Sequence, residues 1–93
     1  MIELHTGEYA EAEHPADVER TFKAIADAVA YARRKGLIVN AGHGLNYHNT
    51  LRVAAIPGIH ELNIGHAIVA RALFTGMKEA VRDMRLLLDQ ARW

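Results

Sequence analysis

The chain has 93 residues, of which 51% are hydrophobic and 24% charged, and these proportions are typical of one small folded domain rather than a disordered tail. Lys and Arg residues number 11 and balance 11 Asp and Glu residues, so the net charge of zero gives no electrostatic reason to expect nucleic acid or an anionic membrane as a partner. The absence of cysteine excludes disulfides, thiolate metal sites and a cysteine nucleophile. The sequence shows neither an apolar run of membrane-spanning length nor a signal peptide at its start, so we expect a cytoplasmic protein.

The first half of the chain predicts a strand, a long helix and a second strand. Residues Ile2–His5 alternate between apolar and polar, as strands do, and Thr6–Tyr9 is expected to be a loop. Apolar residues then recur at spacings of three and four within Asp17–Lys35, after a helix start at His14-Pro15, which predicts an amphipathic helix with a core-facing stripe. The short, apolar segment Leu37–Asn40 predicts the second strand.

The second half predicts a short helix, a third strand and two further helices. Asn49 or Thr50 is expected to cap the short helix, and Glu61–Ile64 is expected to form the strand. A helix over Ala67–Phe74 and a last helix from Met77 follow. The last helix is expected to face the core with an apolar stripe, which consists of Met77, Ala80, Val81, Met84, Leu87 and Leu88.

Three successive strand–helix units favour an α/β fold with a parallel sheet, because parallel strands need long crossover connections. In the first strand Glu3 and His5 share a face, and in the third strand Glu61 and Asn63 do so, with apolar residues opposite. Two interpretations fit this pattern. The polar face lines the inside of a βα barrel near an active site, or it belongs to an open sheet and lies in water.

The ends of the predicted strands carry the residues best suited to chemistry, since parallel βα proteins place their active sites there. The second strand leads into Gly42-His43-Gly44, and the third leads into Gly65-His66 at the start of a helix. Glycine beside a helix N-terminus lets a phosphate approach backbone N–H groups, so Gly44 and Gly65 predict a phosphate cradle. The simpler alternative is that these glycines only permit tight turns.

Histidine and carboxylate side chains at the same strand ends suit proton transfer. His43 lies between two glycines that leave its imidazole accessible, and histidine exchanges protons near neutral pH. The alternative for His43 is a loop histidine bonded to the backbone. Glu3 is placed to exchange a proton or to orient His5 or a substrate group. A metal site built from His5, His43 and His66 lacks any ligand-spacing motif, so we expect no metal.

Three segments of the chain resemble the pyridoxine 5′-phosphate synthase family of vitamin B6 biosynthesis. They are IELHTGEYA, GLIVNAGHGLNYHN and AAIPGIHELNIGHAIVARALFTGMKEAV, and the resemblance runs from Ile2 to about Arg92 without an evident gap. The resemblance implies a (β/α)8 TIM barrel. It implies the condensation of 3-amino-2-oxopropyl phosphate with 1-deoxy-D-xylulose 5-phosphate, which yields pyridoxine 5′-phosphate, inorganic phosphate and water. It also implies that no cofactor or metal is needed and that the enzyme forms homo-octamers.

The same resemblance assigns roles to individual residues. His43 in NAGHG matches the catalytic proton donor, and Glu3 in IELHTG matches a glutamate that points into the active site. Gly44, Gly65 and His66 match residues that bind the phosphate of the amino-ketone substrate. These are the positions that the strand ends indicate independently.

The chain is short for the implied fold, because a βα barrel takes about 250 residues and eight units. We therefore interpret residues 1–93 as the C-terminal part of one barrel domain, covering about the last three units. Catalytic residues on earlier strands are then missing, so we expect this polypeptide alone to be inactive. The alternative is a βα module that associates with itself or binds phosphate without catalysis.

Overall fold

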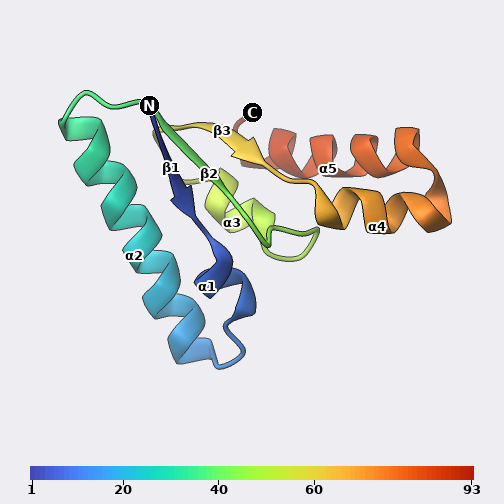
Figure 1. The fold of residues 1–93 in the computed structure, drawn as a ribbon, viewed down its shortest axis with the longest axis horizontal. Helices are drawn as coiled ribbons and strands as arrows, with labels where there is room; N and C mark the ends of the chain where they lie inside the picture. The colour runs from blue at the N-terminus through green and yellow to red at the C-terminus, as the bar shows by residue number, and fades with distance from the viewer.

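The computed structural model describes residues 1–93 and contains three strands and five helices (Figure 1). In chain order they are β1 (Ile2–His5), α1 (Gly7–Glu11), α2 (Pro15–Arg34), β2 (Val39–Gly42), α3 (Thr50–Ala54), β3 (Ile59–Asn63), α4 (His66–Thr75) and α5 (Met77–Ala91). The predicted succession of strands and helices is confirmed, with one addition. Helix α1 replaces the loop predicted at Thr6–Tyr9, because Tyr9 is buried to 6% exposure and draws this segment onto the core.

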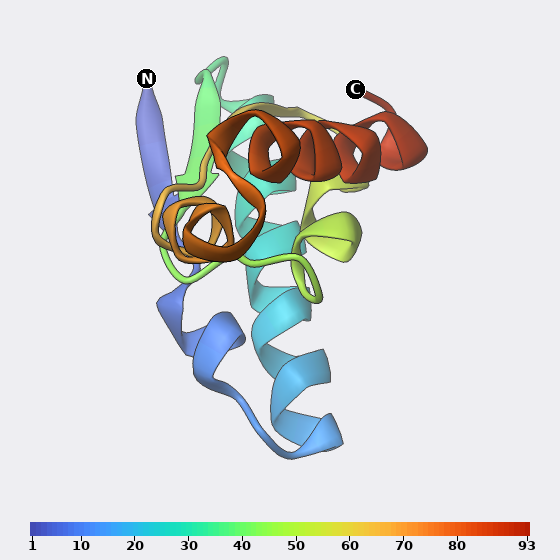
Figure 2. The ribbon, with the colours of Figure 1, turned by 90° about the vertical axis from the view of Figure 1, so that its right-hand side faces the viewer.

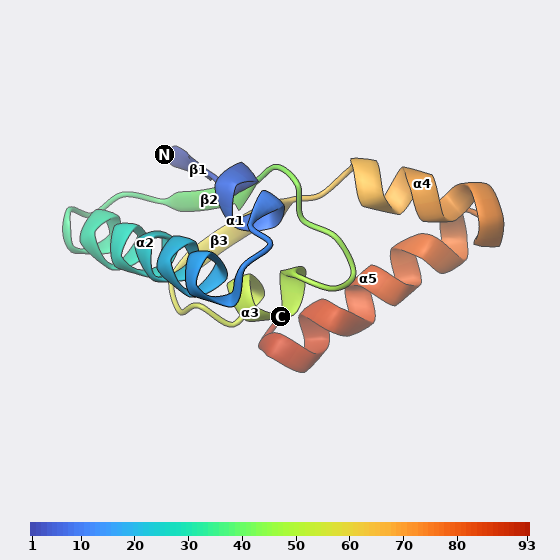
Figure 3. The same cartoon turned by 90° about the horizontal axis from the view of Figure 1, so that it is seen from below.

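The three strands form one parallel sheet in the order β1-β2-β3, as predicted. Helix α2 makes the crossover from β1 to β2, and α3 lies in the crossover from β2 to β3. Both helices lie on the same side of the sheet (Figure 3). The sheet is open in this chain. Glu3 and His5 are exposed on its other side while Ile2 and Leu4 are partly buried, so the alternation predicted for β1 is confirmed.

The second and third strands each lie about two residues from their predicted positions. β2 begins at Val39 and runs to Gly42 instead of covering Leu37–Asn40, and β3 covers Ile59–Asn63 instead of Glu61–Ile64. The exposed side chains of Leu37 and Ile38 precede the ladder, which begins where Val39 meets partners on both sides. β2 extends through the small residues Ala41 and Gly42 because both of them pair with β1 and with β3. All four residues of β2 are buried.

The hydrophobic core lies between the sheet and the two helices that cover it. It consists of Tyr9, Ile25, Val29, Ala32, Val39, Ala41, Leu45, Val53, Ile56 and Ile59. The stripe predicted for α2 faces this core, with Ile25 and Val29 buried and Val18 and Phe22 packed partly against it. That part of the prediction is confirmed.

Helices α4 and α5 form a helical hairpin beside the sheet (Figure 1), and α5 crosses α4 obliquely (Figures 2 and 3). No residue of α4 is buried, and α5 buries only Ala80 and Met84. The prediction that Met77 and Val81 belong to the core is wrong, since their exposed fractions are 53% and 48%. These two residues lie in the half of α5 farther from the sheet. None of the five helices combines the length and the hydrophobicity that a membrane-spanning helix requires.

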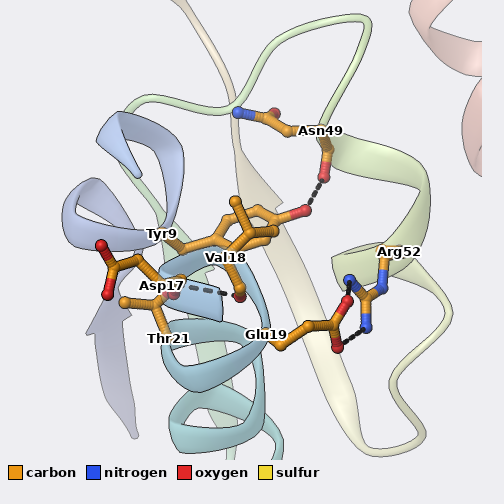
Figure 4. Close-up of polar contacts among 7 residues, drawn as sticks. All are labelled: Tyr9, Asp17, Val18, Glu19, Thr21, Asn49 and Arg52. Carbon is orange, nitrogen blue, oxygen red and sulfur yellow. Dashed lines mark hydrogen bonds and ion pairs between the residues drawn. The ribbon is translucent and has the colours of Figure 1, made fainter. Parts of the chain in front are cut away.

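The segment between β2 and α3 is anchored to α1 and α2 (Figure 4). The Tyr9 hydroxyl donates a hydrogen bond of 2.8 Å to the backbone oxygen of Asn49. Arg52 of α3 donates two hydrogen bonds, of 2.8 and 2.9 Å, to the carboxylate of Glu19, and its guanidinium lies 3.9 Å from the ring centroid of Phe22. These contacts hold Asn49 and the start of α3 against α1 and α2.

Two pKa shifts follow from this anchor. The hydrogen bonds from Arg52 lower the pKa of the Glu19 carboxyl below its ordinary value. Burial raises the pKa of the Tyr9 phenol and outweighs the opposing effect of Arg52, so Tyr9 remains a hydrogen-bond donor throughout the neutral range.

The substitution Glu19→Gln is expected to change how stability depends on pH. Because the folded-state pKa of Glu19 is lowered, its ion pair stabilises the chain above the ordinary glutamate pKa of about 4.3, and this contribution is lost as the pH falls through the lowered value. Urea denaturation should find the wild type modestly more stable than E19Q at pH 7, with the difference shrinking toward pH 3.

Glu13→Gln provides the control, because Glu13 is exposed and forms no ion pair within 4.0 Å. E13Q should follow the wild-type pH dependence. A constant difference between wild type and E19Q across this pH range would contradict the assignment.

Candidate functional site

A partly enclosed pocket of about 470 Å³ lies beyond the carboxyl ends of β2 and β3. Its lining residues are His43, Gly44, Leu45, Asn63, Ile64, Gly65 and His66. Four of the five residues predicted for the site therefore lie on one surface, although Gly44 and Gly65 are 21 residues apart in the sequence (65 − 44). The parallel sheet accounts for this, because parallel strands end at the same edge.

The fifth predicted residue, Glu3, does not line the pocket but contacts a residue that does. The side-chain amide of Asn63 donates a hydrogen bond of 3.2 Å to Glu3 Oε2. This bond crosses over Gly42, which pairs with Asn63, and a Cβ at Gly42 would come within 2.9 Å of the Asn63 backbone oxygen. The missing side chain of Gly42 thus leaves room for the polar link between Glu3 and the pocket.

His43 is the only residue other than glycine with a positive φ, at 89°. A non-glycine residue in such a conformation costs about 1–3 kcal/mol, and it persists only where surrounding contacts hold it. The imidazole is exposed on the pocket side and stacks on the His5 ring, with 4.3 Å between ring centroids and 25° between planes. The ring of His43 thus has one face against protein and its edge available to a ligand.

The two glycines of the predicted phosphate cradle are held in different ways. Gly44 has a φ of 76°, and a Cβ there would lie 2.6 Å from the Cβ of Ala10, so the chain's own geometry requires a glycine. Gly65 has φ of −130° and ψ of −58°, outside the helical region, and no atom lies within 4 Å of a built Cβ. The space beside the backbone of Gly65 is therefore open, unlike that beside Gly44.

The N-terminus of α4 opens at the same pocket. Gly65 is its N-cap and His66 its first residue, and no side chain caps the helix. The first backbone hydrogen bond runs from Val69 N to Gly65 O at 3.0 Å. The preceding N–H groups have no partner within the helix, as at any helix N-terminus, and such groups favour anions.

The sequence prediction does not identify two residues that contact the predicted site residues. Asn63 is predicted only as a polar-face residue and Thr6 only as part of a loop, yet Asn63 contacts Glu3 and the Thr6 hydroxyl contacts the backbone of His43. The signal for Asn63 is its position at the end of β3, in register with Gly42. No group of three or more metal-ligating side chains converges anywhere in the structure.

Comparison with known proteins identifies the family. Residues 1–90 match the model of the family described as pyridoxal phosphate biosynthesis protein PdxJ. The pyridoxine 5′-phosphate synthase of Thioalkalivibrio sulfidiphilus is 60% identical over 92 residues, which cover 99% of this chain and 37% of that protein. The enzyme of the same name from Alcanivorax borkumensis is 61% identical over 88 residues, covering 95% of this chain and 36% of that protein. The chain spans just over a third of the length of these relatives. The predicted resemblance is thus confirmed, and the chain belongs to the PdxJ family of pyridoxal phosphate biosynthesis proteins.

Proposed function

We propose that the chain supplies part of the active site of a pyridoxine 5′-phosphate synthase. The reaction is the condensation of 3-amino-2-oxopropyl phosphate with 1-deoxy-D-xylulose 5-phosphate, a transferase reaction, in the cytoplasm and without a cofactor or metal. The observation that carries the proposal is the single pocket lined by His43, Gly44, Gly65 and His66, in a chain about 60% identical to two synthases. Family membership supports the function, and the geometry of the pocket supports placing it at these residues.

The phosphate of the amino-ketone substrate binds, in this proposal, between Gly44 and the N-terminus of α4. The backbone N–H groups at Gly65 and His66 supply donors, and the open space at Gly65 lets phosphate oxygens approach the main chain. The exposed His66 imidazole adds a further donor. Anchoring the phosphate places the remainder of the substrate toward His43, on the opposite wall of the same pocket.

Proton transfer is assigned to His43 and Glu3. The condensation requires dehydration and ring closure, and each of these steps moves a proton at a carbon or an oxygen. His43 acts as the proton donor from its exposed ring edge. The Glu3 carboxylate, linked to the pocket through Asn63, exchanges a proton with the substrate or orients a substrate group.

The whole enzyme is, we propose, a (β/α)8 TIM barrel in which residues 1–93 form the C-terminal part. Two features support closure with further strands: β1 and β3 each have one neighbour only, and the side-chain oxygen of Asn40 is buried without a hydrogen-bond partner. Asn40 pairs with Glu3 and Glu61, so these three residues share the polar side of the sheet. That side becomes the barrel interior.

Self-association belongs to the same proposal, with a homo-octamer as the family's assembly. Leu73 and Phe74 of α4 are 82% and 92% exposed, and large apolar side chains at this exposure mark interaction surfaces when they cluster. Sedimentation velocity should therefore detect species larger than the 10.3 kDa chain at micromolar concentration. A single monomeric species across the concentration range would contradict this part of the proposal.

The isolated chain is expected to show no synthase turnover, whereas a chimeric enzyme is expected to be active. In the chimera this chain replaces the matching 92-residue segment of the Thioalkalivibrio sulfidiphilus synthase. Product formation from both substrates should be comparable with that of the parent enzyme. His43→Ala in the chimera should lower kcat by about 10²–10⁴-fold, the usual contribution of a general acid.

His60→Ala is the matched control, because His60 is an exposed histidine of β3 that lies outside the pocket. The H60A chimera should retain its rate. Full activity of the H43A chimera would overturn the assignment of His43. Turnover by the isolated chain well above that of its own H43A variant would instead overturn the expected inactivity of the isolated chain.

The pair Gly44→Ala and Gly65→Ala should separate a structural from a ligand-binding glycine. Gly44→Ala places a Cβ against Ala10 at positive φ and should lower the free energy of unfolding by roughly 1–3 kcal/mol. Gly65→Ala should change stability by less than about 1 kcal/mol and yet weaken the binding of inorganic phosphate. Urea denaturation and a phosphate titration followed by amide NMR shifts measure the two effects. Unchanged phosphate affinity in G65A would exclude a cradle at Gly65.

A further inference from the structure

We propose that Thr6 is a positioning residue that holds His43 in its active geometry through a single buried hydroxyl. The inference rests on the proposed function in one respect, namely that His43 takes part in the reaction. The contacts between Thr6, His5 and His43 are independent of the reaction.

The Thr6 hydroxyl lies within hydrogen-bond distance of two carbonyl groups, that of Gly42, which precedes His43, and that of His43 itself. Thr6 is fully buried, and its Oγ1 lies 2.8 Å from the backbone oxygen of Gly42 and 2.6 Å from that of His43. One hydroxyl proton is shared between these two acceptors. The Thr6 backbone N–H also donates to the Gly42 oxygen at 2.8 Å. Because the two carbonyls define the peptide planes before and after His43, this contact fixes both backbone dihedrals of that residue.

This fixation is needed at His43 because its backbone conformation is unfavourable for a residue with a side chain. At a φ of 89° the residue relaxes unless its neighbours oppose it. The side chain of His43 is exposed, so packing against the core does not stabilise this backbone conformation. The hydroxyl of Thr6, which directly follows the neighbouring strand β1, supplies the restraint.

The usual local role of threonine at this position does not account for Thr6. It is the N-cap residue of α1, and threonine at an N-cap normally bonds a backbone N–H of the first turn. Its side chain forms no such bond here. The hydroxyl is directed across the sheet, to residues 36 and 37 positions away in the sequence.

The residues beside Thr6 complete the arrangement by fixing the His43 ring. His5 stacks on His43, and the backbone N–H of Gly7 donates to His5 Nδ1 at 3.2 Å, which sets the orientation of the His5 ring. A Cβ at Gly7 would come within 2.5 Å of the His5 ring and 3.0 Å of the His43 ring. Three consecutive residues thus act on His43: Thr6 on its backbone, His5 on its ring, and Gly7 by leaving space for the stacked pair.

The test compares Thr6→Val, which removes the hydroxyl at nearly constant volume, with Thr6→Ser, which keeps it. In the 93-residue chain, nuclear Overhauser contacts between the ring protons of His5 and His43 should be present in wild type and T6S and lost in T6V. In the chimeric synthase T6V should lower kcat by about tenfold to a hundredfold, the effect of misplacing a catalytic group, with KM changed by less than about twofold. T6S should restore most of the rate.

Thr21→Val is the control for loss of a buried threonine hydroxyl, since Thr21 is 5% exposed and bonds the Asp17 oxygen within α2, away from the pocket (Figure 4). T21V should keep both the ring contacts and kcat. The inference is overturned if T6V keeps the ring contacts and the wild-type kcat, or if T6S loses as much as T6V. An inactive wild-type chimera would count against the proposed function alone, because the ring contacts of T6V and T6S still decide the role of Thr6.

Discussion

The register of the central strand β2 with both neighbours determines where every candidate site residue lies. Gly42 pairs with His5 on one side and with Asn63 on the other, so all three strands end at one level and their following loops meet. Because side chains alternate along a strand, a shift of one residue would turn Glu3 and Asn63 to the core side and break their contact. Gly42 makes this register compatible with the hydrogen bond between Asn63 and Glu3, because a side chain at Gly42 would occupy the space that Asn63 uses.

The two walls of the pocket are supported very differently. The wall with His43 and Gly44 is held to α1 through Tyr9, to the end of β1 through Thr6, and to α5 through the Tyr47 hydroxyl, which donates to the Ala80 oxygen at 2.6 Å. The wall with Gly65 and His66 continues into α4, no residue of which is buried. Local stability follows buried contacts, so the side of the pocket with His43 and Gly44 is the more rigid one, and the side with Gly65 and His66 depends on the packing of α4 against α5.

The sequence predicts the order of elements and most of the site, because both depend on local patterns. Alternation reveals β1, apolar spacing reveals α2, and glycine beside histidine at the strand ends marks the pocket residues. Prediction is weaker where tertiary contacts decide. β2 extends through Ala41 and Gly42 because neighbouring strands bury them, α1 forms because Tyr9 is buried, and Met77 and Val81 lie outside the core because α5 projects beyond the sheet. The role of Thr6 is invisible in the sequence for the same reason, since its partners are 36 and 37 residues away.

This distribution of contacts explains how just over a third of a synthase-length chain retains a defined arrangement at His43. The unfavourable backbone of His43 is opposed by Thr6, and Thr6 lies in place because β1 pairs with β2, a pairing wholly within this chain. The stacked His5 ring comes from the same pair of strands. The geometry of the proposed proton donor therefore depends on two adjacent strands rather than on closure of a whole barrel. Further strands would add other contacts: partners for the free edges of β1 and β3, and cover for the polar side of the sheet.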